Sequence, residues 1–135
     1  MSYFNSRQLL RRAHSELDAA HLQSSPREQF LHAHMAALRG AAAVLAINPA
    51  VVSPARRKVR SAWVQLAEAG EEWGPWVEFY LASAATRAAL ESGQLREIDA
   101  SNAREAARAA GQFLAAVEEH IARHEAEFAA LAKAS

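Results

Sequence analysis

Apolar residues recur at helical spacing along most of the chain, and the clearest stripe follows Ser25. Ser25, Pro26 and Glu28 supply a side-chain cap, a proline at the first helical position and a capping box. The helix is expected to end near Ile47, because the residue before Pro49 avoids the helical region. Its apolar face comprises Phe30, Leu31, His34, Met35, Leu38, Ala41, Ala42 and Leu45. The pattern predicts the central helix of a bundle, with small residues at 40–43 that admit a close neighbour.

Four further stretches show the same periodicity. They are predicted to run from Asn5 or Ser6 to Gln23, from Ser53–Pro54 to Ala69, from Pro75 to Gly93, and from Asp99 or Ser101 to Lys133. In the last stretch the apolar residues follow a heptad spacing, and a straight helix there would reach about 50 Å. Residues 122–135 therefore either project to meet a second copy or fold back. The sequence predicts one all-α domain over residues 1–135, an up-and-down bundle of four or five helices with a long C-terminal helix.

Composition supports this class and narrows the location. Half of the residues are apolar, at 51%, and there are only 5 glycines and 4 prolines. The absence of cysteine excludes disulfides and cysteine-based zinc sites. Neither a secretory leader nor an apolar run long enough to span a membrane is seen, so we expect a cytoplasmic protein without membrane contact.

Charge is balanced overall but uneven along the chain. The formal net charge is zero, so any affinity for nucleic acid must come from a local patch. The densest cationic run opens the predicted third helix, where the helix dipole disfavours cations, and acidic residues crowd its other end. The run consists of Arg56, Arg57, Lys58 and Arg60, and the acids are Glu68, Glu71 and Glu72. Two interpretations stay open: the run binds nucleic acid or an acidic protein, or it is neutralised by the protein's own acids.

One Arg–His pair has a spacing that suits phosphate chemistry. Arg27 and His34 lie on one side of the central helix, whereas His32 lies about 140° away. A histidine acting as general acid or base, with an arginine that stabilises developing phosphate charge, can cleave RNA without a metal. The alternative is a hydrogen-bonded interior His34 and a surface Arg27.

Two other groups are expected to be structural. The aromatic residues at the joint of the third and fourth helices are expected to pack into the end of the bundle, although they also suit base stacking. They are Trp63, Trp73, Trp76, Phe79 and Tyr80. His120 and His124 are one turn apart but lack a third ligand, so we predict no metal and no cofactor. The heptad seam is the predicted dimer interface, through Leu114, Val117, Ile121, His124 and Phe128.

Three segments carry a family resemblance. AHMAALRGAAAVLA, SAWVQLAEAG with a Trp-rich turn after it, and REAARAAGQFLAAVEEHI occur in an order that resembles the HEPN superfamily, in particular an actinobacterial branch without an assigned activity. The resemblance implies a bundle of four or five helices that forms a homodimer. Active members are RNases with an Arg-x4-6-His motif near the start of the last helix. Arg104 and Arg108 occupy that region here, but the next histidine is His120, so the resemblance does not carry the catalytic role over.

Other members of the superfamily bind RNA or nucleotides, or act as protein partners, and genes of the resembling branch often neighbour a translesion polymerase gene. This suggests a protein partner in DNA metabolism. Our leading hypothesis is a non-catalytic HEPN-type homodimer that contacts nucleic acid or a protein through the basic run. The alternatives are a metal-independent RNase using Arg27 and His34, and a structural adaptor whose basic run pairs with Glu71 and Glu72.

Overall fold

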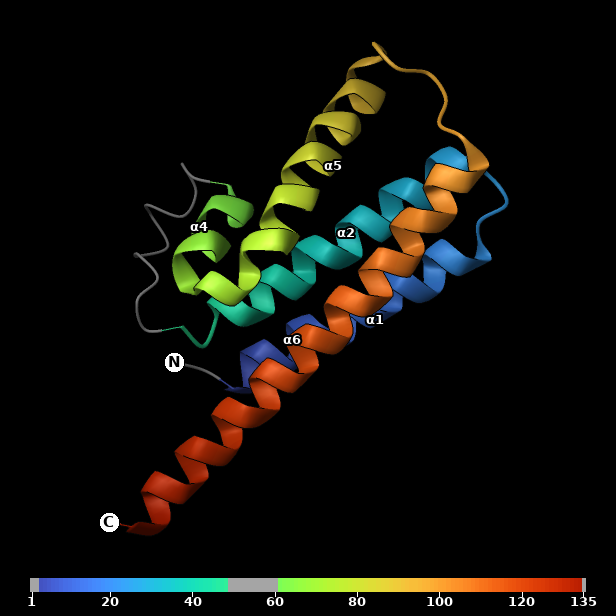
Figure 1. Ribbon diagram of the computed structural model, residues 1–135. Coiled ribbons are helices and arrows are strands. Elements are labelled where there is room, and N and C mark those ends of the chain that lie inside the picture. The colour runs from blue at the N-terminus through green and yellow to red at the C-terminus, as the bar shows by residue number, and fades with distance from the viewer. Residues whose placement is uncertain (1–2, 49–60, 135) are drawn as a thin grey trace.

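The computed structural model describes residues 3–48 and 61–134. Within these ranges the chain forms five α-helices and one short 3-10 helix, and it contains no strand. The elements are α1 (Tyr3–Leu22), α2 (Pro26–Leu45), α4 (Ala62–Ala69), η1 (Glu71–Trp73), α5 (Gly74–Ser92) and α6 (Ala100–Ala134). Figure 1 shows α1, α2 and α6 side by side, with α4 and α5 on the far side of α2 from α1. The predicted all-α bundle with a long C-terminal helix is confirmed.

Helix α2 is the centre of the bundle, as its sequence predicts. Its start is capped by Ser25, whose Oγ accepts a hydrogen bond from the Glu28 amide at 3.3 Å. The helix contacts α1, α4, α5 and α6, and it is therefore buried on more than one face. At Gly40 a Cβ atom would lie 2.6 Å from Cδ2 of Leu114, so α6 approaches α2 more closely than a side chain there would allow.

The start of α1 differs from the prediction. The helix begins at Tyr3, so neither Asn5 nor Ser6 caps it. Ser6 is fully buried and its hydroxyl donates to the carbonyl oxygen of Ala43 in α2, at 2.7 Å. Caps and buried hydroxyls use the same residue types, so a serine within the first turn does not by itself indicate a cap. The inner stripe Leu10, Ala13, Leu17 and Ala20 is buried as predicted.

The predicted start of the third helix, Ser53–Pro54, lies outside the described residues. Ser61 is extended, with ψ 149°, and its Oγ accepts a hydrogen bond from the Val64 amide at 3.2 Å, so α4 begins at Ala62 and the predicted stretch is interrupted at Ser61. It ends before Gly70 as expected. Glu71 and Glu72 belong to the first turn of η1, which leads into α5. Acidic side chains at the start of a helix are stabilised by the positive end of its dipole. Glu71 and Glu72 thus also lie before the positive end of α5, and the cationic end of the predicted pattern lies outside the described residues.

The aromatic residues at the α4–α5 joint form the end of the core, as predicted. Trp63, Trp73 and Tyr80 are each 2% exposed. The rings of Trp63 and Tyr80 are stacked with centroids 4.5 Å apart, and both contact Phe113 of α6. Phe79 is 40% exposed and lies outside this core. The contacts leave no free ring faces on Trp63 and Tyr80 for stacking with bases.

Helix α6 is continuous over 35 residues, which is about 52 Å, and its last turns extend past the other helices (Figure 1). Residues of α1 support its middle: Arg7 forms ion pairs with Glu118 and Glu125, and the Tyr3 hydroxyl donates to the carbonyl oxygen of His124 at 3.1 Å. The two acids also compensate Arg7 for its position at the positive end of α1. Of the two alternatives for residues 122–135, the described part projects and does not fold back.

Candidate functional site

His34 lies in the interior of the bundle. It is 2% exposed and is surrounded by the rings of Phe30, Trp63 and Tyr80, with centroids 6.0–6.3 Å from its own. Its Nδ1 is 2.8 Å from the hydroxyl of Ser83 in α5. Burial, aided by the positive charge of Arg87, lowers the pKa of His34 to about 4. The imidazole is therefore neutral near pH 7.

Arg27 lies apart from this histidine. Its guanidinium is half-exposed and is 3.7 Å from the Glu28 carboxylate. It lines a shallow surface pocket together with Arg96 and Glu97. Within the described residues no hydrogen bond links Arg27 to His34, and the cation that acts on His34 is Arg87. The arrangement corresponds to the alternative considered above: an interior histidine and a surface arginine.

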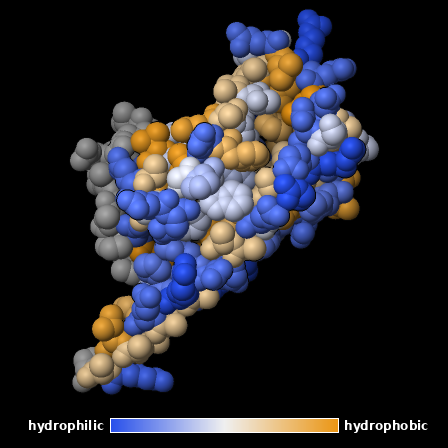
Figure 2. Space-filling view, viewed as in Figure 1, coloured by the Kyte–Doolittle hydropathy of each residue, from blue (hydrophilic) through white to orange (hydrophobic). Residues whose placement is uncertain are grey.

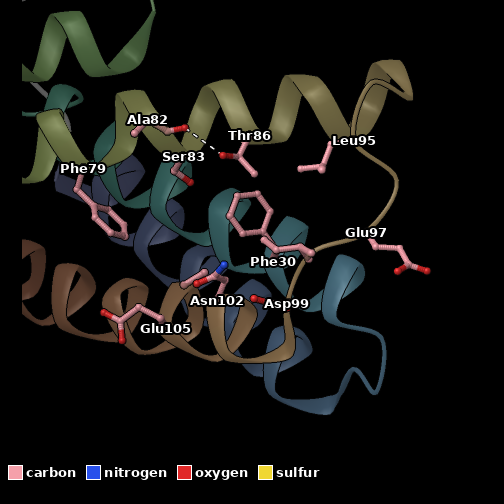
Figure 3. A pocket seen from close by; sticks show the side chains of 12 residues that line it. Phe30, Phe79, Ala82, Ser83, Thr86, Leu95, Glu97, Asp99, Asn102 and Glu105 are labelled. Atoms are coloured by element: carbon pink, nitrogen blue, oxygen red, sulfur yellow. Dashed lines mark hydrogen bonds between the residues drawn. The ribbon is translucent and has the colours of Figure 1, made fainter.

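A larger pocket opens between α5 and the start of α6. Its volume is about 560 Å³, and we call it the α5–α6 pocket. Figure 3 shows Phe30 of α2 between the two helices, with Phe79 on one side and Leu95 on the other. Ser83 and Thr86 line it from α5, and Asp99, Asn102 and Glu105 line it from the other side. Because the Ser83 hydroxyl also meets Nδ1 of His34, the buried histidine lies directly behind this wall.

The predicted dimer interface is only partly on the surface. Leu114, Val117 and Ile121 are each 0% exposed, because they pack inside the protein's own bundle. They cannot contact a second copy, and the prediction is wrong for these three. His124 is half-buried, whereas Phe128 is 57% and Leu131 71% exposed. The available apolar surface of α6 therefore begins after its first six turns, and Figure 2 shows hydrophobic residues along this projecting end.

The comparison with protein families identifies the family of this chain. A family model described as SAV_6107-like HEPN matches residues 20–118, well over half of the chain. The chain belongs to the HEPN family. No match is found among curated proteins, and none among solved structures. The family match covers α2, α4, α5 and the first half of α6, so it includes His34 and the α5–α6 pocket.

The predicted basic run of this HEPN protein, Arg56, Arg57, Lys58 and Arg60, lies outside the described residues. Within the described part, another group of charges lines a cleft of about 480 Å³ between α1 and α2. There His32 Nδ1 is 2.8 Å from one carboxylate oxygen of Glu16, and Arg39 is 3.5 Å from the other. Glu16 lies in another helix, so the sequence pattern of α2 gives no sign of this contact. His32 and Arg39 therefore share one acidic partner, Glu16.

His120 and His124 of the HEPN domain are neighbours, with ring centroids 4.4 Å apart. His120 is 7% exposed and packs edge-on against Trp73, and burial lowers its pKa. No group of three or more metal-ligating side chains is found in residues 3–48 and 61–134. In the same residues, no helix is long and apolar enough to cross a membrane.

Proposed function

We propose that this HEPN protein is a non-catalytic interaction module that forms a homodimer and contacts nucleic acid or an acidic protein. The homodimer is supported by the projecting end of α6. Two large apolar side chains, Phe128 and Leu131, remain exposed there on a helix that continues past the bundle. A second copy of the same surface would cover them through a two-fold contact, the commonest form of oligomer.

The absence of catalysis is supported by the environment of His34. A general acid must hold a proton near the working pH and reach the substrate. His34 is buried, and its pKa is lowered to about 4. Arg27, the other member of the candidate pair, faces solvent at the start of the same helix. The geometry therefore gives the RNase hypothesis no support.

Changing Phe128 and Leu131 to glutamate is expected to convert a dimer into a monomer. Light scattering of the wild type at tens of micromolar should give twice the chain mass, and the double variant should give the chain mass itself. Phe128 packs against the ring of Tyr3, with centroids 5.6 Å apart, but both residues are largely exposed and lie outside the buried core, so the melting temperature of the folded chain should fall only slightly. The control is Glu119→Lys, an exposed change on the same helix, which should leave the mass unchanged. A wild type that stays monomeric at these concentrations would remove the homodimer from the proposal.

Reversing the four charges of the basic run to glutamate is expected to weaken binding of a fluorescent 20-nucleotide single-stranded RNA by at least tenfold. It should also flatten the dependence of binding on salt, because fewer phosphates would be neutralised. Fluorescence anisotropy at several salt concentrations measures both effects. The matched control reverses four exposed arginines elsewhere and so produces the same net charge: Arg11, Arg96, Arg104 and Arg123.

Equal losses in both variants would assign the effect to net charge and remove the run from the proposal. A lower melting temperature with unchanged RNA binding would instead support the structural adaptor, in which the run pairs with the protein's own acids. If the wild type binds no RNA, the acidic-protein arm of the proposal is what remains.

A further inference from the structure

The α5–α6 pocket has the walls of a small-molecule site. Its volume of about 560 Å³ lies within the range of ligand pockets. Phe30 and Ile98 contribute apolar surface, and the two more exposed side chains are Phe79 at 40% and Leu95 at 38%. Exposed aromatic and aliphatic side chains on opposite sides of one cavity are a surface that a ligand's hydrocarbon part can cover. Figure 3 shows the ring of Phe30 between them.

The polar groups of the pocket select the charge of that ligand. The hydroxyls already have partners in the protein, since Ser83 meets His34 and Thr86 donates to the Ala82 carbonyl oxygen at 3.3 Å (Figure 3). Glu105 is paired with Arg108 by a hydrogen bond of 2.8 Å.

The two other carboxylates, those of Asp99 and Glu97, form no ion pair in the part of the chain that the structure describes, and Glu97 also lines the surface pocket that contains Arg27 and Arg96. No lysine or arginine is among the residues that line the pocket. The unpaired charge in the lining is therefore negative.

We propose that the α5–α6 pocket binds a small organic cation, an ammonium or guanidinium group attached to an apolar body. The apolar body lies against Phe30 and Phe79, and the cation lies near Asp99 and Glu97. A cation beside an aromatic face gains further attraction from the ring electrons. This inference does not depend on the homodimer or on the basic run, which involve other residues.

The test uses three fluorescent probes that share one dansyl ring and differ in charge at the end of the chain: dansylcadaverine, its neutral N-acetyl derivative and dansyl-6-aminohexanoate. The cationic probe is expected to bind saturably with a blue-shifted emission. It should bind roughly three- to tenfold more tightly than the neutral probe, the gain from two partly solvated carboxylates. The anionic probe should bind more weakly still.

Two variants place the binding in this pocket. Glu97→Gln with Asp99→Asn should abolish the preference for the cation while leaving the neutral probe bound, because each change removes a charge and keeps the size of the side chain. Ala82→Phe, an exposed position on α5, should fill the pocket and weaken all three probes. Glu119→Gln is the control for a lost surface charge elsewhere on α6.

Three outcomes would overturn the inference. They are no saturable binding of dansylcadaverine up to 1 mM in about physiological salt, equal affinity for the three probes, and binding that Ala82→Phe leaves unchanged. If Ala82→Phe instead dissociated a dimer seen by light scattering, a second copy would be the occupant of the pocket, and the inference would likewise fail. Melting curves of each variant confirm that the measured chain is folded.

Discussion

Replacing Gly40 by leucine is expected to lower the free energy of unfolding by about 3 kcal/mol or more. A Cβ atom at this position would lie 2.6 Å from Cδ2 of Leu114 and 3.3 Å from Cε2 of Phe113. Both neighbours are 0% exposed, so neither side chain can move aside into solvent. A larger side chain must push α6 away from α2, and these two helices form the centre of the core. Urea unfolding followed by tryptophan fluorescence measures the change.

The size of the neighbouring side chain gives a sharper version of this test. Gly40→Ala combines a clash with the gain of about 1 kcal/mol that alanine brings to a helix interior. In a chain that already carries Leu114→Ala the closest contact is removed and only the 3.3 Å approach to Phe113 remains, so the same change at position 40 should become less destabilising or stabilising. A double-mutant cycle isolates this coupling.

Gly111 in α6 provides the matched control. A Cβ atom there would lie 3.7 Å from Cδ2 of Leu17, an ordinary contact. Gly111→Ala is therefore expected to raise the free energy of unfolding by about 0.5–1 kcal/mol. If Gly40→Leu stayed within about 1 kcal/mol of the wild type, the close approach of α2 and α6 would be contradicted.

The helices could be predicted because their signals are local. Ser25 caps α2 through an amide three residues away, and Gly93 ends α5 in the left-handed conformation, with φ 83°. The inner face of α1 follows from the spacing of its own apolar residues. Each of these features depends on neighbours within one or two turns, so a single sequence is enough to find them.

The errors concern features that depend on distant parts of the chain. The heptad spacing of α6 correctly identified a buried seam, but spacing does not say whether the covering helix belongs to the same chain. Ile121 is covered by the protein itself, whereas Phe128, one heptad later, is 57% exposed because only the ring of Tyr3 lies against it. Ser6 was misassigned for a similar reason, since its acceptor is Ala43 in another helix.

The candidate site was hardest to predict, because its residues come together only in the fold. The α5–α6 pocket combines Phe30 with residues 79–86 and 95–106, and no motif joins these segments in the sequence. His32 and His34 are two residues apart, yet Glu16 of α1 contacts the first and Ser83 of α5 contacts the second. The two histidines therefore differ because of contacts from α1 and α5, which the sequence pattern of α2 alone does not show.

The buried His34 is expected to make the stability of the folded protein depend on pH. Its ordinary pKa of 6.5 applies in the unfolded chain, and burial beside Arg87 lowers the pKa to about 4 in the folded protein. Between these values the unfolded chain takes up a proton that the folded protein does not. Stability is therefore lost as the pH falls through this window, by about 2 kcal/mol between pH 7.5 and 5 and about 3 kcal/mol by pH 4.

His34→Gln removes the titrating group while keeping a side chain that can hydrogen-bond Ser83. Urea unfolding at pH 7.5 and at pH 5 should show a smaller loss of stability in this variant than in the wild type, by about 2 kcal/mol. The exposed His21 supplies the control, His21→Gln, because its side chain meets solvent in both states. Equal losses in the wild type and in His34→Gln would mean that His34 accepts a proton within the folded protein near neutral pH. The imidazole would then have access to solvent, and it could act as the general acid that the RNase hypothesis requires.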